Sequence, residues 1–181
     1  DEGDRITHQA IIDQVQHLNA NLVEITGGEP LIQPAVFPLM KDLCDLGYQV
    51  LLETSGERDI SEVDPRVIRI IDIKTPCSGA ADSFLMENLD DLRAADEIKF
   101  VIVNREDFEW SMEVVQSNDL LDRVHAVLFS PVMKQEGNAS IDGCDGLEPE
   151  QLASWILESD TPVRLHMQLH KYVWPPDMRG V

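Results

Sequence analysis

The sequence predicts an α/β fold in which helices cover a parallel β-sheet. Short apolar runs with the composition of strands alternate with amphipathic stretches that have the spacing of helices. The runs are apolar on both faces, which is typical of strands buried in a parallel sheet. This pattern fits either a doubly wound sheet or part of a barrel. The 181 residues suffice for one domain with a sizeable core, so we expect a single domain over residues 1–181.

Five segments have the apolar periodicity and the boundary residues of helices. In the first, apolar residues recur on one face, and Asp4 or Thr7 is placed to cap its start. In the second, Pro34 lies near the start and Gly47 is placed to end the helix. We expect helices at 6–19, 34–47, 87–94, 107–120 and 148–158.

Six apolar runs between these segments have the length of strands. The run at 67–74 is nearly continuous in Val and Ile, which favours a strand buried in the sheet. Residues 133–146 are rich in Gly and Asp and predict a loop. We expect strands at 22–25, 49–53, 67–74, 97–103, 124–129 and 163–169.

The chain is strongly acidic, with 14 basic and 34 acidic residues and a formal net charge of −20. Such a surface repels nucleic-acid phosphates and anionic lipids, so we expect no direct nucleic-acid partner and no membrane association. The cysteines Cys44, Cys77 and Cys144 lie far apart and are odd in number, which argues against a disulfide framework. We therefore expect a protein of a reducing compartment, the cytoplasm.

Polar and ionisable residues follow the predicted strands at their carboxyl ends. One explanation is that each strand simply ends where the polar residues begin. It does not account for Glu53 and Lys74, which directly continue apolar runs. Parallel α/β folds bind ligands at this edge, and a buried charge there must be paired or bind something. The sequence therefore predicts a ligand site at this edge. The residues at five strand ends are Thr26, Gly27, Gly28 and Glu29; Glu53, Thr54 and Ser55; Asp72 and Lys74; Ser130; and Gln168, His170 and Lys171.

Two adjacent glycines, Gly27 and Gly28, follow the first predicted strand. They lack the spacing of a dinucleotide fingerprint and the lysine of a phosphate loop. Glycine lets the backbone approach a ligand closely, Glu29 adds a carboxylate acceptor, and Pro30 fixes the turn. Exposed backbone beside a carboxylate suits a ligand that carries an ammonium group.

The segment 25–31, Ile-Thr-Gly-Gly-Glu-Pro-Leu, resembles the GGEP motif of radical S-adenosylmethionine enzymes, which holds the amino group of the cofactor's methionine. Further segments resemble, in order along nearly the whole chain, the 7-carboxy-7-deazaguanine synthase family of that superfamily. The resemblance implies an incomplete parallel (β/α) barrel of the radical S-adenosylmethionine type. The further segments are E-T-S-G at 53–56, D-x-K-x-P-x-S-G at 72–79, E-x-K-F-V-I at 97–102, S-P-V at 130–132, Q-L-H-K-Y-V-W-P-P at 168–176 and R-G-V at 179–181.

The resemblance implies a carbon–nitrogen lyase of queuosine biosynthesis, which supplies a precursor for tRNA modification. The family rearranges 6-carboxy-5,6,7,8-tetrahydropterin into 7-carboxy-7-deazaguanine with loss of ammonia. A 4Fe-4S cluster cleaves S-adenosylmethionine to a 5′-deoxyadenosyl radical that abstracts hydrogen from the pterin, and magnesium assists. The implied partners are the pterin substrate, an electron donor such as flavodoxin, and a second copy of the chain in a homodimer.

The resemblance also implies roles for single residues. Thr26 would hydrogen-bond the pterin, His170 would approach it, and the terminal carboxylate of Val181 would meet it. Ser130 and Pro131 match a cofactor loop in which some relatives have Gln-Pro. No catalytic residue is assigned. The residues implied to bind S-adenosylmethionine are Gly27, Gly28, Glu29, Glu53, Ser55, Asp72, Ile73, Lys74, Ser130 and Pro131.

The family's CxxxCxxC cluster motif is absent from this sequence. We expect it upstream of residue 1, together with the threonine that meets magnesium. We interpret Cys44 as a packing residue and Cys77 as an incidental thiol, so we expect no metal ligand in this chain as written. Lys99 either pairs at the surface or lines the barrel, and we favour the barrel.

Two other functions stay open. A chain that truly lacks the cluster motif would bind S-adenosylmethionine or a pterin without catalysis, and the upstream coding sequence separates this hypothesis from the enzyme. A radical enzyme that acts on another substrate would also carry the GGEP segment. The segments 72–79 and 168–171 argue against that second alternative.

Overall fold

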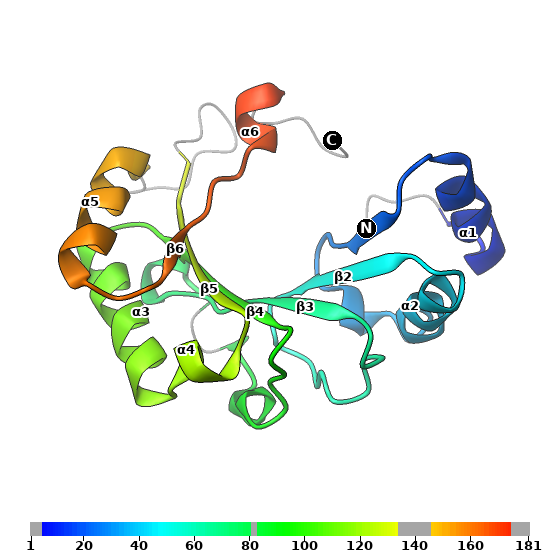
Figure 1. The fold of residues 1–181 in the computed structure, drawn as a ribbon, viewed down its shortest axis with the longest axis horizontal. Coiled ribbons are helices and arrows are strands. Elements are labelled where there is room, and N and C mark those ends of the chain that lie inside the picture. Colours follow the sequence, from blue (N-terminus) through cyan, green and yellow to red (C-terminus); the bar gives the residue numbers. More distant parts are fainter. Residues whose placement is uncertain (1–4, 81–82, 134–145, 175–181) are drawn as a thin grey trace.

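Six strands form one parallel sheet in the part of the chain that the computed structural model describes, residues 5–80, 83–133 and 146–174 (Figure 1). The strands are β1 (Leu22–Ile25), β2 (Gln49–Thr54), β3 (Ile68–Asp72), β4 (Glu97–Ile102), β5 (Ala126–Pro131) and β6 (Arg164–Leu165). They lie side by side in chain order, and every neighbouring pair is parallel. Chain order is the order of a (β/α) barrel, whereas a doubly wound sheet reverses at a switch point. The described strands therefore form an open part of a barrel.

Helices cover the outer side of this curved sheet. The described helices are α1 (His8–His17), α2 (Val36–Asp45), α3 (Arg105–Ser117), α4 (Leu120–Arg123), α5 (Pro149–Ser159) and α6 (His170–Val173). In Figure 1, α2 to α5 lie along the outside of the arc, and the inner side opens toward the top of the view, between α1 and α6. We call the side of the sheet that packs on α2 to α5 the outer face and the other side the inner face.

Alternate residues of the strands pack outward against these helices and form the core. On β4, Ile98, Phe100 and Ile102 are fully buried, and Phe100 meets Phe129 of β5 edge-on with 5.5 Å between ring centroids. Helix α3 adds Phe108, whose ring centroid lies 5.6 Å from that of Phe129. Burial of each such side chain stabilises the fold by roughly 1.5–3 kcal/mol, so this layer fixes the helices on the sheet.

Most predicted elements are present, with ends shifted by a few residues. Thr7 caps α1, because its Oγ1 accepts a hydrogen bond of 3.2 Å from the N–H of Ala10. Gly47 follows α2 with a φ of 91°, a left-handed conformation that favours glycine. The predicted helix 107–120 corresponds to α3, which begins two residues earlier and ends at Ser117, and Asp119 with a φ of 50° separates it from the short α4.

The predicted helix at 87–94 is wrong. The chain forms only a 3-10 helix there, η4 (Met86–Leu89). Asn88 is buried, and its Nδ2 donates to the carbonyl of Gly56 at 2.8 Å while its Oδ1 accepts from the N–H of Ile60 at 3.2 Å. These bonds tie the segment to the loop after β2, so a side chain holds this connection where a longer helix was expected.

The predicted strand at 163–169 is also wrong in length, because β6 contains only two residues. It is an edge strand with one neighbour, and it pairs only Leu128 with Arg164 and Phe129 with Leu165. Both β6 residues are exposed, so no burial of their side chains stabilises a longer strand at this edge. Its apolar composition was therefore a poor guide to its length.

A cavity of about 320 Å³ lies behind β3, where a full helix would otherwise pack. Ile73, directly after β3, lines it from the side of the sheet. Phe84, in the segment before η4, and Trp110 of α3 line the other side. The remaining lining residues are Met86, Leu89, Val114 and Asn118. The packing of helices on the outer face is thus incomplete behind the end of β3.

A fully buried ion pair joins the amino ends of β3 and β4. The Nε of Arg69 donates to the Asp96 carboxylate at 3.0 Å, and both side chains are 0% exposed. Arg69 Nη1 also donates to the carbonyl of Ile60 at 3.1 Å, and the Arg93 N–H donates to Asp96 at 2.7 Å. The pair therefore anchors two loops as well as two strands.

We expect Arg69→Met to lower the free energy of unfolding by about 3–5 kcal/mol, because it leaves the Asp96 carboxylate buried and unpaired. Urea denaturation followed by circular dichroism measures this loss. The matched control is Arg66→Met, since Arg66 is exposed and pairs with Asp64 and Asp45 at the surface. Equal losses in the two variants would contradict the importance of burial.

Candidate functional site

The inner face of the sheet carries the charged residues. Thr54, Ile71 and Ile98 are neighbours on the outer face and are buried in the core. Side chains alternate along a strand, so Glu53 of β2 points to the inner face, and so do Asp72 and Lys99, which are register partners on β3 and β4. The predicted carboxyl-edge residues Glu53 and Asp72 are thus brought together, and Lys99 lies in the barrel rather than at the surface.

These side chains form a row of alternating charge across three strands. The Lys99 ammonium donates a hydrogen bond to Glu53 Oε1 and lies 3.6 Å from Asp72 Oδ2. Lys74 Nζ donates to the same Asp72 oxygen at 2.8 Å. On the other side, Thr26 Oγ1 donates to Glu53 Oε2 at 3.3 Å. We call Thr26, Glu53, Lys99, Asp72 and Lys74 the inner-face network.

The electrostatics of the network keep its charges ionised. Burial raises the pKa of Glu53, but the hydrogen bond and the charge of Lys99 outweigh burial and hold the pKa below its usual value. Burial lowers the pKa of Lys99, but the charge of Asp72 and the hydrogen bond to Glu53 raise it above its usual value. Both groups are therefore charged at neutral pH, in a site where Lys99 itself is only 5% exposed.

The turn after β1 presents bare backbone at the carboxyl edge. Gly27 and Gly28 have φ values of 95° and 59°, and no atom lies within 4 Å of the position that a Cβ would take at either residue. A cavity of about 230 Å³ borders Thr26 and Gly27 on the side of α1 and α2, where Ile11, Val36 and Leu39 also line it. A ligand can therefore approach the backbone of this turn closely.

The Glu29 carboxylate holds this turn on the end of β2. It accepts hydrogen bonds from Thr54 Oγ1 at 2.9 Å, from Ser55 Oγ at 2.7 Å and from the Ser55 N–H at 2.8 Å. It also accepts one of 3.0 Å from the N–H of Leu31. Because Glu29 and Ser55 are bonded to each other, their side chains position the turn, and the backbone of Gly27 and Gly28 is left free to contact a ligand.

Asp107 is a site residue that the sequence did not reveal as such. It is fully buried at the start of α3, and its carboxylate accepts from Thr75 Oγ1 at 3.0 Å, the Cys77 N–H at 3.0 Å and the Val103 N–H at 3.2 Å. It thus ties the loops after β3 and β4 together. An acidic residue three positions after Asn104, the cap of α3, is the available signal, since this is the pattern of a capping box.

The other predicted site residues differ in what they present. Ile73 is buried on the outer face, so only its backbone faces the site. Ser130 lies on the inner face of β5, where its Oγ is buried without a hydrogen-bond partner among the described residues, and Pro131 ends that strand. His170 begins α6, and Val181 lies outside the described residues.

The two described cysteines are poorly suited to hold a cluster. Cys44 is partly buried against the core on α2, and Cys77 lies in the 3-10 helix η2 (Pro76–Ser78). Desolvation is the main cause that raises the pKa of both thiols, which disfavours the thiolates that iron needs. Across residues 5–80, 83–133 and 146–174, no group of three or more His, Cys, Asp or Glu side chains is arranged to hold a metal ion.

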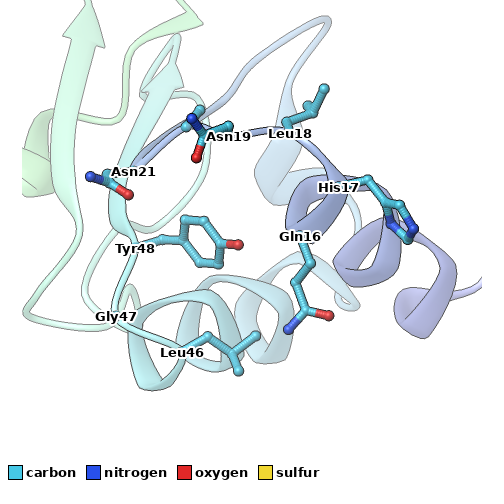
Figure 2. Close-up of a pocket in the computed structure, with 9 residues that line it drawn as sticks. Gln16, His17, Leu18, Asn19, Asn21, Leu46, Gly47 and Tyr48 are labelled. Atoms are coloured by element: carbon cyan, nitrogen blue, oxygen red, sulfur yellow. The ribbon is translucent and has the colours of Figure 1, made fainter.

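A second polar cavity lies at the opposite edge of the sheet (Figure 2). It measures about 320 Å³ and lies between the loops that lead into β1 and β2, with the ring of Tyr48 pointing into it. Its polar lining includes Gln16, Asn19 and Asn21, and it contains no acidic residue, lysine or arginine. Ligands of parallel barrels bind at the carboxyl edge, so this cavity at the amino edge does not compete with the inner-face network as the site.

An open parallel barrel with ionisable groups at its carboxyl edge places the chain in the class of (β/α)-barrel enzymes. No profile of a known protein family matches the chain. It is 43% identical over 182 residues to the 7-carboxy-7-deazaguanine synthase of Koribacter versatilis, covering 99% of this chain and 80% of that protein. It is 39% identical over 184 residues to the synthase of Chlorobaculum tepidum, covering 99% of this chain and 77% of the relative.

The fold is similar to that of a solved structure as well. The crystal structure of QueE from Escherichia coli superposes with a TM-score of 0.61 at 26% sequence identity, over 88% of this chain and 61% of that one. The chain therefore belongs to the 7-carboxy-7-deazaguanine synthase family. Members of this family are radical S-adenosylmethionine lyases of queuosine biosynthesis, and the predicted family and fold class are confirmed.

We expect Glu29→Ala to lower the free energy of unfolding by roughly 1–3 kcal/mol, because the Thr54 and Ser55 donors lose their shared acceptor. Amide exchange at Leu31 and Ser55 should accelerate at the same time, since both N–H groups donate to this carboxylate. Hydrogen-exchange mass spectrometry and urea denaturation measure these effects. Glu57→Ala, which removes only a 3.9 Å surface pair with Arg58, should change neither.

Proposed function

We propose that the full-length protein is a 7-carboxy-7-deazaguanine synthase and that the inner-face network holds its S-adenosylmethionine. The family membership supports the reaction, the conversion of 6-carboxy-5,6,7,8-tetrahydropterin into 7-carboxy-7-deazaguanine with loss of ammonia. The single observation that carries the site is the convergence of Glu53, Asp72 and Lys74 beside the open Gly27–Gly28 backbone.

The groups of this rim fit the chemistry of S-adenosylmethionine. Asp72 Oδ1 is buried and has no hydrogen-bond partner among the described residues, so it offers an acceptor to a hydroxyl or ammonium group. Lys74 is one-third exposed and offers a cation to a carboxylate. The backbone of Gly27 and Gly28 is open to close approach by the ammonium-bearing part of the cofactor. A cavity of about 170 Å³ lies beside Asp72 and Lys74 and provides space at this edge.

The roles of single residues follow from these positions. Glu53 would accept from ribose hydroxyls, while Glu29 and Ser55 would hold the glycine turn in place. Thr26 donates its hydroxyl proton to Glu53, so its lone pairs stay available to the pterin. We also propose that the backbone of Ile73, the loop at Ser130 and Pro131, and the tail with His170 and Val181 complete the site. When bound, the cofactor and a reduced 4Fe-4S cluster supply the radical chemistry that removes a hydrogen atom from the pterin.

The cluster and magnesium need ligands beyond those described. The family implies both, but the described residues contain no group suited to hold them. We propose that these ligands belong to the full-length protein, together with an electron donor such as flavodoxin and a homodimeric state. None of the described helices is long and apolar enough to cross a membrane, and we propose a cytoplasmic location.

The second candidate function is a module that binds S-adenosylmethionine or the pterin without catalysis. It rests on the inner-face network alone, which offers binding groups whether or not radical chemistry follows. An assay of the full-length protein separates the two functions, because both predict binding and only the enzyme predicts product.

We expect the full-length protein, reconstituted anaerobically with iron and sulfide, to convert 6-carboxy-5,6,7,8-tetrahydropterin into 7-carboxy-7-deazaguanine. Dithionite supplies the electrons, and mass spectrometry detects the product and the released ammonia. Reactions without S-adenosylmethionine are the control. An intact cluster with bound cofactor but no deazapurine would reject the proposed reaction.

We expect Asp72→Asn to raise the KM for S-adenosylmethionine roughly tenfold or more, since it removes the negative charge of a carboxylate whose Oδ1 has no partner among the described residues. The change in kcat should be smaller, because the loss concerns binding. Asp59→Asn is the control, as Asp59 is exposed and bonds only to nearby Ser61. Unchanged kinetics in Asp72→Asn would place the cofactor elsewhere.

A further inference from the structure

Lys99 occupies the centre of the inner-face network but is nearly inaccessible. Its side chain is 7% exposed, against 28% for Glu53 and 33% for Lys74. Its ammonium contacts Glu53 on β2 and approaches Asp72 on β3, and the Asp72 side chain is only 11% exposed, so Glu53 is the more accessible of the two carboxylates. The chain has five lysines and 34 acidic residues, and two of those lysines lie in this network.

We propose that Lys99 is a positioning residue of the cofactor site, which holds the Glu53 and Asp72 carboxylates together as two acceptors for hydroxyl and ammonium groups of S-adenosylmethionine. This inference rests on the proposed function of the inner-face network. It adds a residue that neither the sequence motifs nor the family comparison assigns to the cofactor.

The physical argument is the cost of two neighbouring carboxylates. Glu53 and Asp72 lie on adjacent strands, and both approach one ammonium, so without Lys99 two partly buried negative charges would face each other. Burial and like charge both raise the pKa of a carboxyl group, and the pair would then hold a shared proton to a higher pH than a single exposed carboxyl group does. A protonated carboxyl donates a hydrogen bond and loses its charge, so it no longer suits a cationic ligand.

The free oxygens show which groups the lysine leaves for the ligand. Asp72 Oδ2 is taken by Lys74 and Lys99, while Oδ1 is buried without a partner among the described residues. Glu53 Oε1 is taken by Lys99, while Oε2 accepts only the long hydrogen bond from Thr26. One oxygen of each carboxylate is thus fixed by the protein, and the other is left to accept from a ligand.

Other charged groups share this face and act on the same carboxylates. Glu24 of β1 is the register partner of Leu51, Glu97 begins β4, and Arg164 lies on β6. The charge of Lys74 lowers the pKa of Glu53 further. Lys99 is the only residue of the described network that contacts both carboxylates. The other charged groups therefore cannot take over its role when it is removed.

The test compares the affinity for S-adenosylhomocysteine at about pH 8 and about pH 6 by isothermal titration calorimetry, using the full-length protein. The amino and carboxyl groups of this probe do not titrate in that range. In the wild type the Lys99 ammonium lies between both carboxylates, and we expect the dissociation constant to change less than about twofold. In Lys99→Met we expect about tenfold weaker binding at the lower pH, because the two carboxylates then lack their shared cation and one of them takes up a proton more readily.

Two further variants separate positioning from general support of the fold. Lys99→Arg keeps the charge and should restore the flat pH dependence of the wild type. Lys41→Met removes an exposed lysine that pairs with Asp45 on α2, and it should change neither the affinity nor its pH dependence. Thermal unfolding of each variant accompanies the titrations.

The outcomes are distinct. If the wild type does not bind the probe, the proposed function of the inner-face network fails. If it binds and Lys99→Met keeps the wild-type affinity at both pH values, or loses it equally at both, the inference about Lys99 is overturned. If Lys99→Met does not fold, the wild-type titration decides, since an affinity that falls more than about twofold between about pH 8 and about pH 6 would contradict a lysine that pairs with both carboxylates.

Discussion

The alternation of side chains along parallel strands is the constraint on which this structure depends. Because every strand runs in the same direction and in register, one parity of residues enters the core and the other faces the cleft. Ile71 and Ile98 therefore pack under the helices, while Asp72 and Lys99, one residue further along, meet on the opposite face. A one-residue slip of β3 or β4 would bury the charges and expose the core, so the register of the sheet and the charge pattern of the cleft are specified together.

Carboxylates do two kinds of work at the carboxyl edge. Glu29 and Asp107 have their oxygens filled by donors from the chain, and they hold the loops after β1, β2, β3 and β4 in place. Glu53 and Asp72 have oxygens that are only half filled. Carboxylates of the first kind hold the loops of this edge in place, and those of the second kind leave acceptors for a ligand. The residue type is the same in both, so only the hydrogen-bond partners of each oxygen distinguish them.

The sequence predicted what local patterns and ordered motifs can specify. The alternation of strands and helices, the cap at Thr7 and the convergence of Glu53 with Asp72 were foreseen and are present. The helix at 87–94 was not correct, because the role of Asn88 depends on a partner loop some thirty residues away in the chain. The structural role of Glu29 was missed for the same reason, since its donors come from the end of another strand. Periodicity describes one segment at a time, and these interactions join two.

The cavity behind β3 affects how easily the carboxyl end of that strand can shift. Ile73 borders that cavity on the outer side, while its two chain neighbours, Asp72 and Lys74, face the cleft. A tightly packed interior resists displacement, but a side chain beside open volume loses few van der Waals contacts when it shifts. A small shift of Ile73 toward this cavity would therefore cost few packing contacts, and the rings of Phe100, Phe108 and Phe129, which do not line the cavity, would keep their packing.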